Sequence, residues 1–287
     1  MSRTARDDAG APTTAAPAWS MPTLREPRYS QSLERGLAIL RCFTAARPVL
    51  GIADIAAELD MSRPTTHRYV STLEALGYLE QGAGRKYRLG LRVTDLGLAA
   101  LNATGLRDQA HDELVALSRG TSYTAGLAVL DGAEVLYVDR VVGPRGTDPA
   151  GALGLQPGSR LPAHCTALGK VLLAHLPDDA QRAVLAELQL PKRGPNTITS
   201  RRTLREQLAE FRSSPLAVAD RELSEQLSAI AAPVRGQDGA VRAAVNLAAP
   251  AAAISASDLA DGLGPHLLAA ADRISARLGW RRAGERA

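Results

Sequence analysis

The segment from Ser62 to Gly77 carries basic and short polar side chains at helical spacing. At about 100° per residue, one face of a helix over this segment turns toward a core and comprises Thr66, Tyr69, Val70, Leu73 and Leu76. The other face, with Ser62 as its cap, comprises Arg63, Thr65, His67, Arg68 and Ser71. A guanidinium donates paired hydrogen bonds to a guanine or a phosphate, and hydroxyl and imidazole groups bond to base edges. The pattern therefore predicts a helix that reads nucleic acid, with Arg68, Thr65 and His67 as the base-contact candidates.

Positive charge is concentrated around the same segment. The formal net charge of the chain is only +4. Residues 62–92 hold six basic and two acidic side chains, so this stretch alone accounts for the total. Arg85 and Lys86 fall where a β-ribbon is expected to turn, and from such a tip they would contact the sugar–phosphate backbone. A basic patch in an otherwise neutral protein is typical of a polyanion-binding surface.

Three short helices and a ribbon are predicted around this patch. The helices are expected over residues 30–44, 52–59 and 62–77, and two short strands are expected over 78–89, joined at Gly82 and Gly84. The first helix is predicted to turn one apolar stripe inward, consisting of Leu33, Leu37, Ile39 and Leu40. Helix, helix, helix and ribbon in this order predict a winged helix-turn-helix, which we assign to residues 29–91.

A connecting helix and a larger second domain are predicted after the ribbon. Helical spacing extends over 92–119 with a break near Gly105, and we assign this stretch to a linker. Within 120–280, strand-like runs such as 123–130 and 241–249 are mixed with helix-like runs such as 165–176 and 201–212. This mixture predicts an α+β domain with an antiparallel sheet and helices packed on it. Residues 1–28 are expected to be a disordered tail, and 281–287 a short second tail.

Composition and motifs limit the remaining classes. Hydrophobic residues make up 45% of the chain and charged residues 22%, which is typical of a globular protein. No apolar run approaches the roughly 18 residues of a membrane span and no secretory signal begins the chain, so we expect no membrane partner and a cytoplasmic location. Cys42 and Cys165 belong to different predicted domains, so no disulfide is expected. Metal-ligand spacings and phosphate-binding glycine motifs are lacking, so we predict no metal and no cofactor.

Several longer stretches resemble the IclR family of transcriptional regulators. In the N-terminal part these are SLERGLAIL, IADIAAEL, MSRPTTHRYVSTLEALGYL and KYRLG. In the C-terminal part they are GSRLPAHCTALGKVLLA, VADRELSEQLSAIAAPV and AAVN. The resemblance runs from about Arg28 to Trp280. The segments PAHCTALGKVLLA, TSYTAGLAVLDG and KRGPNTITS are most similar to the branch that regulates aromatic-acid breakdown, the protocatechuate and p-hydroxybenzoate regulators of the β-ketoadipate pathway.

The resemblance implies a regulator that binds a palindromic operator in double-stranded DNA as a homo-oligomer, either a dimer or a dimer of dimers. It also implies a GAF- or PAS-like domain that binds a small effector, here an aromatic or related organic acid. Carried over by position, the effector pocket is expected to include Gly154, Leu155, His164, Cys165, Thr166, Asp220, Ser228, Ala229 and Asn246. Arg145 and Arg160 are expected nearby, where they would attract a carboxylate.

Two departures from the family pattern bear on the effector. Gln226 stands where the family often has a glycine, and Ala229 stands where a cysteine or serine often faces the pocket. Ala229 lacks a polar group, so the effector is expected to differ from the best-known ones.

Two other functions remain open at this point. One is a repressor that needs no effector, and the other is a small-molecule enzyme that uses the C-terminal pocket. His164 beside Cys165 suggests a nucleophile with its base, but adjacent residues on a helix or strand point in different directions. Polar residues near apolar strand ends, such as Thr166 and Asn246, favour a sensor. The sequence therefore predicts an effector-controlled regulator and not an enzyme.

Overall fold

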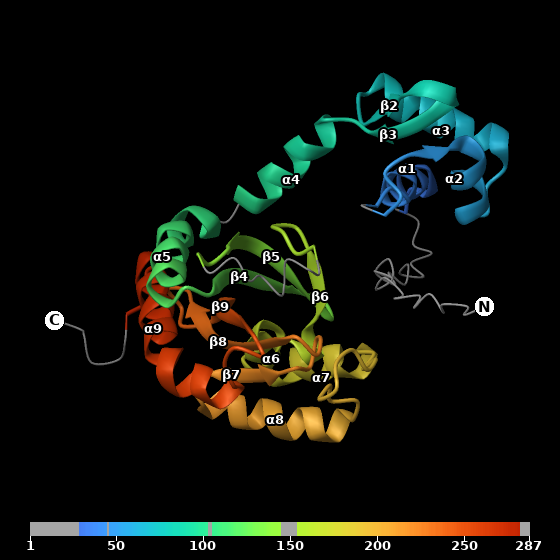
Figure 1. The fold of residues 1–287 in the computed structure, drawn as a ribbon. Helices are drawn as coiled ribbons and strands as arrows, with labels where there is room; N and C mark the ends of the chain where they lie inside the picture. The colour runs from blue at the N-terminus through green and yellow to red at the C-terminus, as the bar shows by residue number, and fades with distance from the viewer. Residues whose placement is uncertain (1–28, 45, 103–104, 145–153, 282–287) are drawn as a thin grey trace, which may run out of the picture. The chain divides into compact units, whose positions relative to one another are not determined.

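The computed structural model describes residues 29–44, 46–102, 105–144 and 154–281. The predicted tail 1–28 and all but the first residue of the tail 281–287 thus lie outside the described residues. The chain divides into two compact units, Met1–Leu98 and Ala99–Ala287, and each is considered by itself (Figure 1).

The first unit consists of three helices and a small antiparallel sheet. The helices are α1 (Gln31–Arg41), α2 (Ile52–Glu58) and α3 (Arg63–Ala75). The sheet has the order β1 (Leu50–Gly51), β3 (Lys86–Leu89) and β2 (Leu79–Gln81), and the short 3-10 helix η1 (Ala83–Arg85) lies in the β2–β3 turn. The winged helix-turn-helix is confirmed. Strand β1 was not predicted because its two residues are too few to show a periodicity.

Helix α3 begins and ends at the signals that the sequence contains. The Ser62 side chain accepts the N–H of Thr65 at 3.3 Å, which satisfies one of the unpaired donors of the first turn. Gly77 adopts a φ of +77°, a conformation that a side chain disfavours, and the chain turns there into β2. The orientation of the reading face therefore depends on local residues.

The predicted inner stripe of α1 is wrong in part. Ile39 is fully buried, whereas Leu33 is 64% exposed and Leu37 is 52% exposed. Leu33 lies roughly 120° around the helix from Ile39, so both side chains cannot face the same core. Leu76, predicted on the inner face of α3, is also exposed. Sequence periodicity identified the apolar faces but not which of them this small unit covers.

Two helices follow the ribbon, with a break at the predicted place. Helix α4 (Arg92–Asn102) ends before Gly105, which has a φ of +60°, and α5 (Leu106–Thr121) begins directly after it. Helix α5 was placed in the linker range 92–119, but its apolar residues lie in the core of the second unit: Leu106, Ala110, Leu114 and Leu117.

The second unit is built on a six-stranded antiparallel sheet in the order β6-β5-β4-β9-β8-β7. The strands are β4 (Thr124–Asp131), β5 (Glu134–Val141), β6 (Arg160–Pro162), β7 (Ala217–Asp220), β8 (Leu227–Arg235) and β9 (Val241–Pro250). The predicted α+β class with an antiparallel sheet is confirmed.

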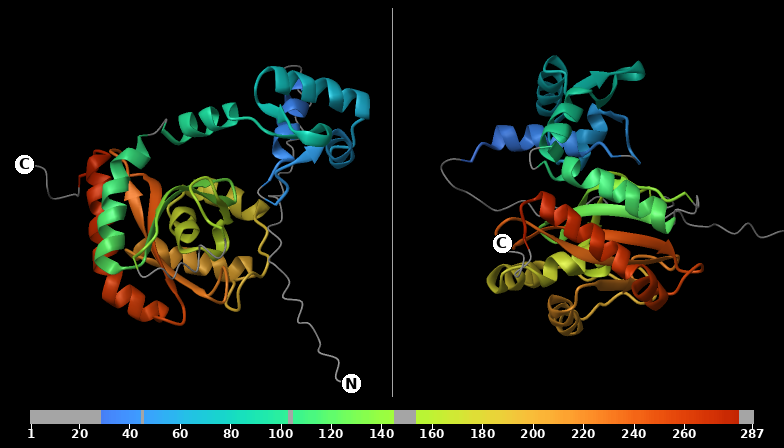
Figure 2. Two further views of the ribbon diagram at one scale, coloured as in Figure 1. Left: turned by 45° about the horizontal axis from the view of Figure 1, so that its top comes forward. Right: turned by 90° about the vertical axis from the view of Figure 1, so that its left-hand side faces the viewer.

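Helices cover both faces of this sheet (Figures 1 and 2). Helices α5 and α9 (Ala256–Arg277) pack on the face that carries Ile230 and Val245. The other face carries Ala229 and Ala244. The elements on this side of the sheet are the 3-10 helix η2 (Ala163–Cys165) and the helices α6 (Ala167–Ala174), α7 (Asp178–Glu187) and α8 (Arg201–Ser213). Alternate residues of β8 and β9 therefore belong to two separate cores. The core that includes Ala229 and Ala244 contains the candidate ligand pocket.

Candidate DNA interface and ligand pocket

Helix α3 turns its inner face to the core and its basic face to solvent. Thr66 and Val70 are fully buried. The predicted nucleic-acid contacts on this helix are all exposed or half-buried, and they are Ser62, Arg63, Thr65, His67, Arg68 and Ser71. A helix end with exposed guanidinium, imidazole and hydroxyl groups is chemically suited to the major groove of DNA.

Neighbouring side chains orient several of these groups. Ser62 Oγ donates a hydrogen bond to Thr65 Oγ1 at 2.8 Å, and Ser71 Oγ lies 3.4 Å from His67 Nδ1. The Arg68 guanidinium carbon lies 5.8 Å from the centre of the Tyr69 ring, within the range of a cation–π contact. These contacts reduce the conformational freedom that the side chains would lose on binding.

The ribbon presents two basic side chains at its turn. Arg85 and Lys86 are both exposed, and the Gly82 N–H donates to the Lys86 carbonyl at 2.8 Å. Arg88, further along β3, donates two hydrogen bonds to Glu80, at 3.0 and 2.8 Å. Since Glu80 already compensates Arg88, the charge at the tip comes from Arg85 and Lys86. This arrangement fits the predicted backbone-contacting wing.

A cavity lies between helix α6 and the sheet of the second unit. It is lined by Tyr137, Leu161, Cys165, Thr166, Ala167, Leu168, Ala219, Leu223, Leu227, Ala229, Asn246 and Ala248. Its volume of about 20 Å³ admits roughly one water molecule. A ligand the size of an aromatic ring therefore enters only if lining side chains move.

The cavity has a polar end and a polar wall. Ala167 and Leu168 are the first residues of α6, so their N–H groups lack intrahelical acceptors and lie at the positive end of the helix dipole. Asn246 on β9 is 4% exposed, and its Oδ1 has no hydrogen-bond partner among the described residues. A buried acceptor of this kind is costly unless a ligand or water donates to it.

Four of the nine predicted effector residues line this cavity: Cys165, Thr166, Ala229 and Asn246. The other five do not. His164 is fully buried with Nε2 3.2 Å from the Pro191 carbonyl, and Ser228 donates to Asp220 at 2.7 Å. Leu155 is buried in the same core, and Gly154 turns the chain beside it with a φ of +65°.

The sequence did not single out the apolar part of the lining. Ala219, Ala229 and Ala248 are direct neighbours on three adjacent strands, and all three line the cavity. The period-two rule applied from Ala229 would have indicated Leu227 on the same face. The strand pairing that adds Ala219 and Ala248 is a long-range contact, which no local pattern contains.

Of the two predicted arginines, the one that the structure describes, Arg160, is not found in the pocket. Arg160 pairs with Asp131 at 2.5 Å and with Glu134 at 3.6 Å, and it is not a lining residue. The expectation that Arg160 attracts a ligand carboxylate is therefore unsupported, because two nearby carboxylates already compensate its charge. Arg145 lies outside the described residues.

The geometry does not favour His164 and Cys165 as a catalytic pair. Cys165 Sγ donates to the Pro162 carbonyl at 3.7 Å, and burial raises the pKa of its thiol to about 12. Burial also lowers the pKa of His164. A thiol that stays protonated is a poor nucleophile.

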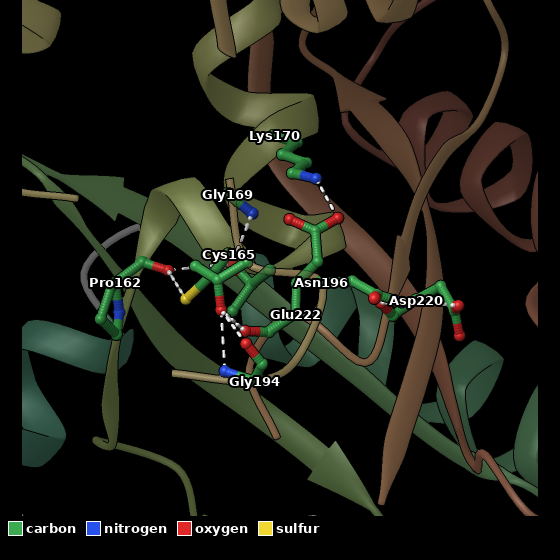
Figure 3. A network of polar contacts seen from close by, with 10 residues as sticks. Pro162, Cys165, Gly169, Lys170, Gly194, Asn196, Asp220 and Glu222 are labelled. Carbon is green, nitrogen blue, oxygen red and sulfur yellow. Dashed lines mark hydrogen bonds and ion pairs between the residues drawn. The ribbon is translucent and has the colours of Figure 1, made fainter. Parts of the chain in front are cut away.

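A buried polar network joins α6 to the segment that follows β7, and the sequence analysis missed it (Figure 3). The Lys170 ammonium on α6 is fully buried and bonds to Glu222 Oε1. The Glu222 carbonyl accepts hydrogen bonds from Thr197 Oγ1 at 2.5 Å and from the Gly194 N–H at 2.9 Å. Lys170 falls at an inward position of an apolar helix, and this is the signal that could have identified it.

A winged helix-turn-helix joined to a sensing domain with an internal cavity defines a DNA-binding transcriptional regulator controlled by a small molecule. Comparison with known families is specific. Residues 32–83 match the IclR helix-turn-helix domain, and residues 98–276 match the bacterial transcriptional regulator IclR C-terminal domain. The chain belongs to the IclR family, and its class is that of a regulator rather than an enzyme.

Individual relatives agree with this assignment. The chain is 33% identical to the HTH-type transcriptional regulator XynR of Escherichia coli, over 80% of this chain and 90% of the relative. It is 32% identical to the Pca regulon regulatory protein of Pseudomonas putida, over 90% of this chain and 88% of that relative. An IclR homologue from Microbacterium hydrocarbonoxydans, solved in complex with 4-hydroxybenzoate, superposes with a TM-score of 0.75 at 28% identity and covers 86% of this chain and 98% of its own.

The described residues lack two further kinds of feature. They contain no group of three or more His, Cys, Asp or Glu side chains placed to hold a metal ion. In the same part of the chain, no helix is both long and apolar enough to cross a bilayer.

Proposed function

We propose that the protein binds a palindromic operator as a homo-oligomer and that a small aromatic acid in the α6 cavity controls this binding. The observation that carries the proposal is the pairing of an exposed basic α3 with a small cavity whose Asn246 Oδ1 has no hydrogen-bond partner among the described residues. DNA as the target also implies that the protein acts in the cytoplasm.

For DNA, α3 is the reading helix and the β2–β3 turn is the wing. Arg68, Thr65 and His67 contact base edges, with Ser62, Arg63 and Ser71 beside them on the same helix. Arg85 and Lys86 contact phosphates and set the register.

Exposed leucines support assembly with a second copy of the chain. Leu91 is 81% exposed, Leu96 is 56% exposed and Leu98 is 45% exposed, all in or next to α4. Leu33 and Leu37 add an apolar stripe on α1. Such surface is costly in water, and association of two or four copies removes it from solvent. A two-fold assembly presents two α3 helices to two half-sites, which accounts for a palindromic operator.

For the effector, the cavity matches a small acid with an apolar body. The carboxylate accepts from the N–H groups of Ala167 and Leu168 at the start of α6. The ring packs on Ala219, Ala229 and Ala248, and a hydroxyl at the other end donates to Asn246 Oδ1. The Microbacterium homologue, solved with 4-hydroxybenzoate, provides independent support for this ligand class. Because the ligand enters only when the cavity opens, its affinity differs between the open and the closed conformation of the domain. Control of DNA affinity by a ligand requires such a difference.

A DNA-binding titration in the presence and absence of ligand tests the proposal. Fragments from the promoter region next to the protein's own gene are titrated by fluorescence anisotropy, with and without millimolar 4-hydroxybenzoate or protocatechuate. We expect specific binding and a shift of at least about fivefold with one of the acids. Specific binding with no response to any acid would indicate a repressor without an effector, and turnover of an acid would indicate an enzyme.

A further inference from the structure

The buried pair Lys170–Glu222 has no role in the function described so far. Lys170 is fully buried and Glu222 is 5% exposed. Replacing a buried ion pair of this kind by apolar residues is often neutral or stabilising, so stability alone does not explain its presence. Its position is informative, because α6 also provides the first-turn N–H groups of the cavity and Leu223, next to Glu222, lines the cavity.

The cavity lacks a positive charge of its own. Among the described residues that line it, none is a lysine, arginine or histidine. The start of a helix contributes the equivalent of only about half an elementary charge, while a buried carboxylate is costly unless it is neutralised. Lys170 is the nearby buried cation, but Glu222 already compensates it.

We propose that a carboxylate ligand binds in the α6 cavity together with one proton, which is taken up by Glu222. The proton converts Glu222 from carboxylate to carboxylic acid, and the positive charge of Lys170 then balances the ligand instead. No bond other than the O–H bond is formed, and the proton comes from solvent. This inference rests on the proposed function, since it concerns the same effector site.

The hydrogen bonds of the two neighbouring acids identify Glu222 as the proton acceptor. Asp220 uses both carboxylate oxygens, since Oδ1 accepts from Ser228 and Oδ2 accepts from Asn196. Glu222 uses Oε1 for Lys170, whereas Oε2 is buried without a partner among the described residues. A carboxylate with one unbonded oxygen can take a proton there without giving up a hydrogen bond, whereas a carboxylate with both oxygens bonded must lose one.

The other titratable groups around Glu222 do not take this proton near neutral pH. Cys165, on η2, already holds its proton because burial raises its pKa to about 12. Burial lowers the pKa of His164, with Lys170 and Arg193 acting in the same direction, so a second proton on its ring is disfavoured. On helix α8, the Phe211 ring lies 6.0 Å from the Lys170 ammonium and has no proton to exchange.

The pKa shifts of the pair agree with this assignment. Burial raises the pKa of Glu222 above its usual value, against the opposing effects of Lys170 and of the Ile198 backbone, and the Asp220 charge adds to the rise. Burial lowers the pKa of Lys170, against the opposing effect of Glu222. An anion placed beside the pair raises the pKa of Glu222 further, so ligand binding and protonation favour each other. Affinity for a carboxylate should therefore weaken as the pH rises through the pKa of Glu222.

Isothermal titration calorimetry on the full-length protein tests the inference. Benzoate and 4-hydroxybenzoate are titrated at pH 6, 7 and 8 in phosphate and in Tris, whose different ionisation enthalpies reveal proton uptake. We expect uptake of up to about one proton with a Kd that rises by up to about tenfold per pH unit. The neutral analogue 4-hydroxybenzamide should bind without proton uptake.

Variants assign the proton to a residue. Glu222→Gln should abolish proton uptake and flatten the pH profile. Asp220→Asn, the matched control, should retain proton uptake, with a profile moved toward lower pH because the Asp220 charge helps to raise the pKa of Glu222. Carboxylate binding without proton uptake, or uptake that persists in Glu222→Gln, would overturn the inference. Should Glu222→Gln fail to fold, the comparison of acid and amide in the unmodified protein still decides. Failure of both acids to bind, with DNA binding intact, overturns the inference but leaves the DNA-binding function standing.

Discussion

At the scale of single residues, the basic side chains of Arg68 and Lys86 in the first unit have different expected tasks. Arg68 is exposed on α3 and lies over the Tyr69 ring, which favours a defined direction for its guanidinium. Lys86 is exposed at the turn of the ribbon. A guanidinium that bonds to a base edge confers sequence discrimination, whereas an ammonium on a phosphate adds affinity that is independent of sequence.

Substitution of these two residues should separate the two tasks. Arg68→Ala should cost about 1–3 kcal/mol of operator affinity and reduce discrimination against unrelated DNA. Lys86→Ala should weaken binding to the operator and to unrelated DNA by the same factor. It should also reduce the slope of log K against log salt by about one unit. Anisotropy titrations at several salt concentrations measure both effects, with Arg88→Ala as the control because Glu80 already pairs with Arg88. Equal loss on both DNAs for Arg68→Ala would remove it from the base contacts.

At the scale of elements, the close approach of α6 to η2 fixes the polar end of the cavity. Gly169 lies on the first turn of α6, and a β-carbon built there would come within 2.2 Å of the Ala163 carbonyl oxygen. Backbone atoms cannot yield as a flexible side chain can, so only glycine allows this contact. The same contact keeps Ala167 and Leu168 at the cavity wall.

Gly169→Ala should therefore destabilise the protein and weaken effector binding together. We expect a loss of roughly 1–3 kcal/mol in the free energy of unfolding, because the added methyl group forces α6 away from η2. The matched control is Gly262→Ala on α9, where nothing lies within 4 Å of the added carbon. Gly262→Ala should raise the free energy of unfolding of the protein by roughly 0.5–1 kcal/mol, because alanine has a higher helix propensity than glycine. Urea unfolding measures both, and similar effects of the two changes would contradict the steric argument.

At the scale of the whole molecule, the exposed leucines of the first unit bear on assembly. Leu33 and Leu37 lie one turn apart on α1 and are exposed, although the sequence pattern placed them in a core. Periodicity reports an apolar face correctly but does not say whether the chain itself or a second copy covers that face. The proposed oligomer is the simplest account of this difference.

Introducing a charge into this stripe should weaken the oligomer. Leu33→Glu is expected to shift the sedimentation distribution toward smaller species, because a carboxylate would be buried without a partner in the interface. Gln31→Glu adds the same charge at another exposed position of α1 and should leave the distribution nearly unchanged. Operator binding should fall with the oligomer, since one reading helix contacts only one half-site. An unchanged distribution for Leu33→Glu would exclude α1 from the interface.

Local sequence signals determined much of this protein. The cap at Ser62, the turn at Gly77 and the break at Gly105 fixed helix ends because each depends on a few adjacent residues. The basic face of α3 followed from helical periodicity alone. Short elements such as β1 and β6 were missed, because two or three residues cannot establish a period.

Only the tertiary structure decided the composition of the pocket. Cys165, Thr166, Ala229 and Asn246 line the cavity, but Asp220 and Ser228 bond to each other instead. The partnership of Lys170 with Glu222 joins residues 52 positions apart. Strand order and helix packing bring such residues together, and these long-range contacts depend on the whole fold. Side-chain type and spacing therefore fixed what each segment could become, whereas burial and pairing across the sheet fixed which groups remain free to meet a ligand.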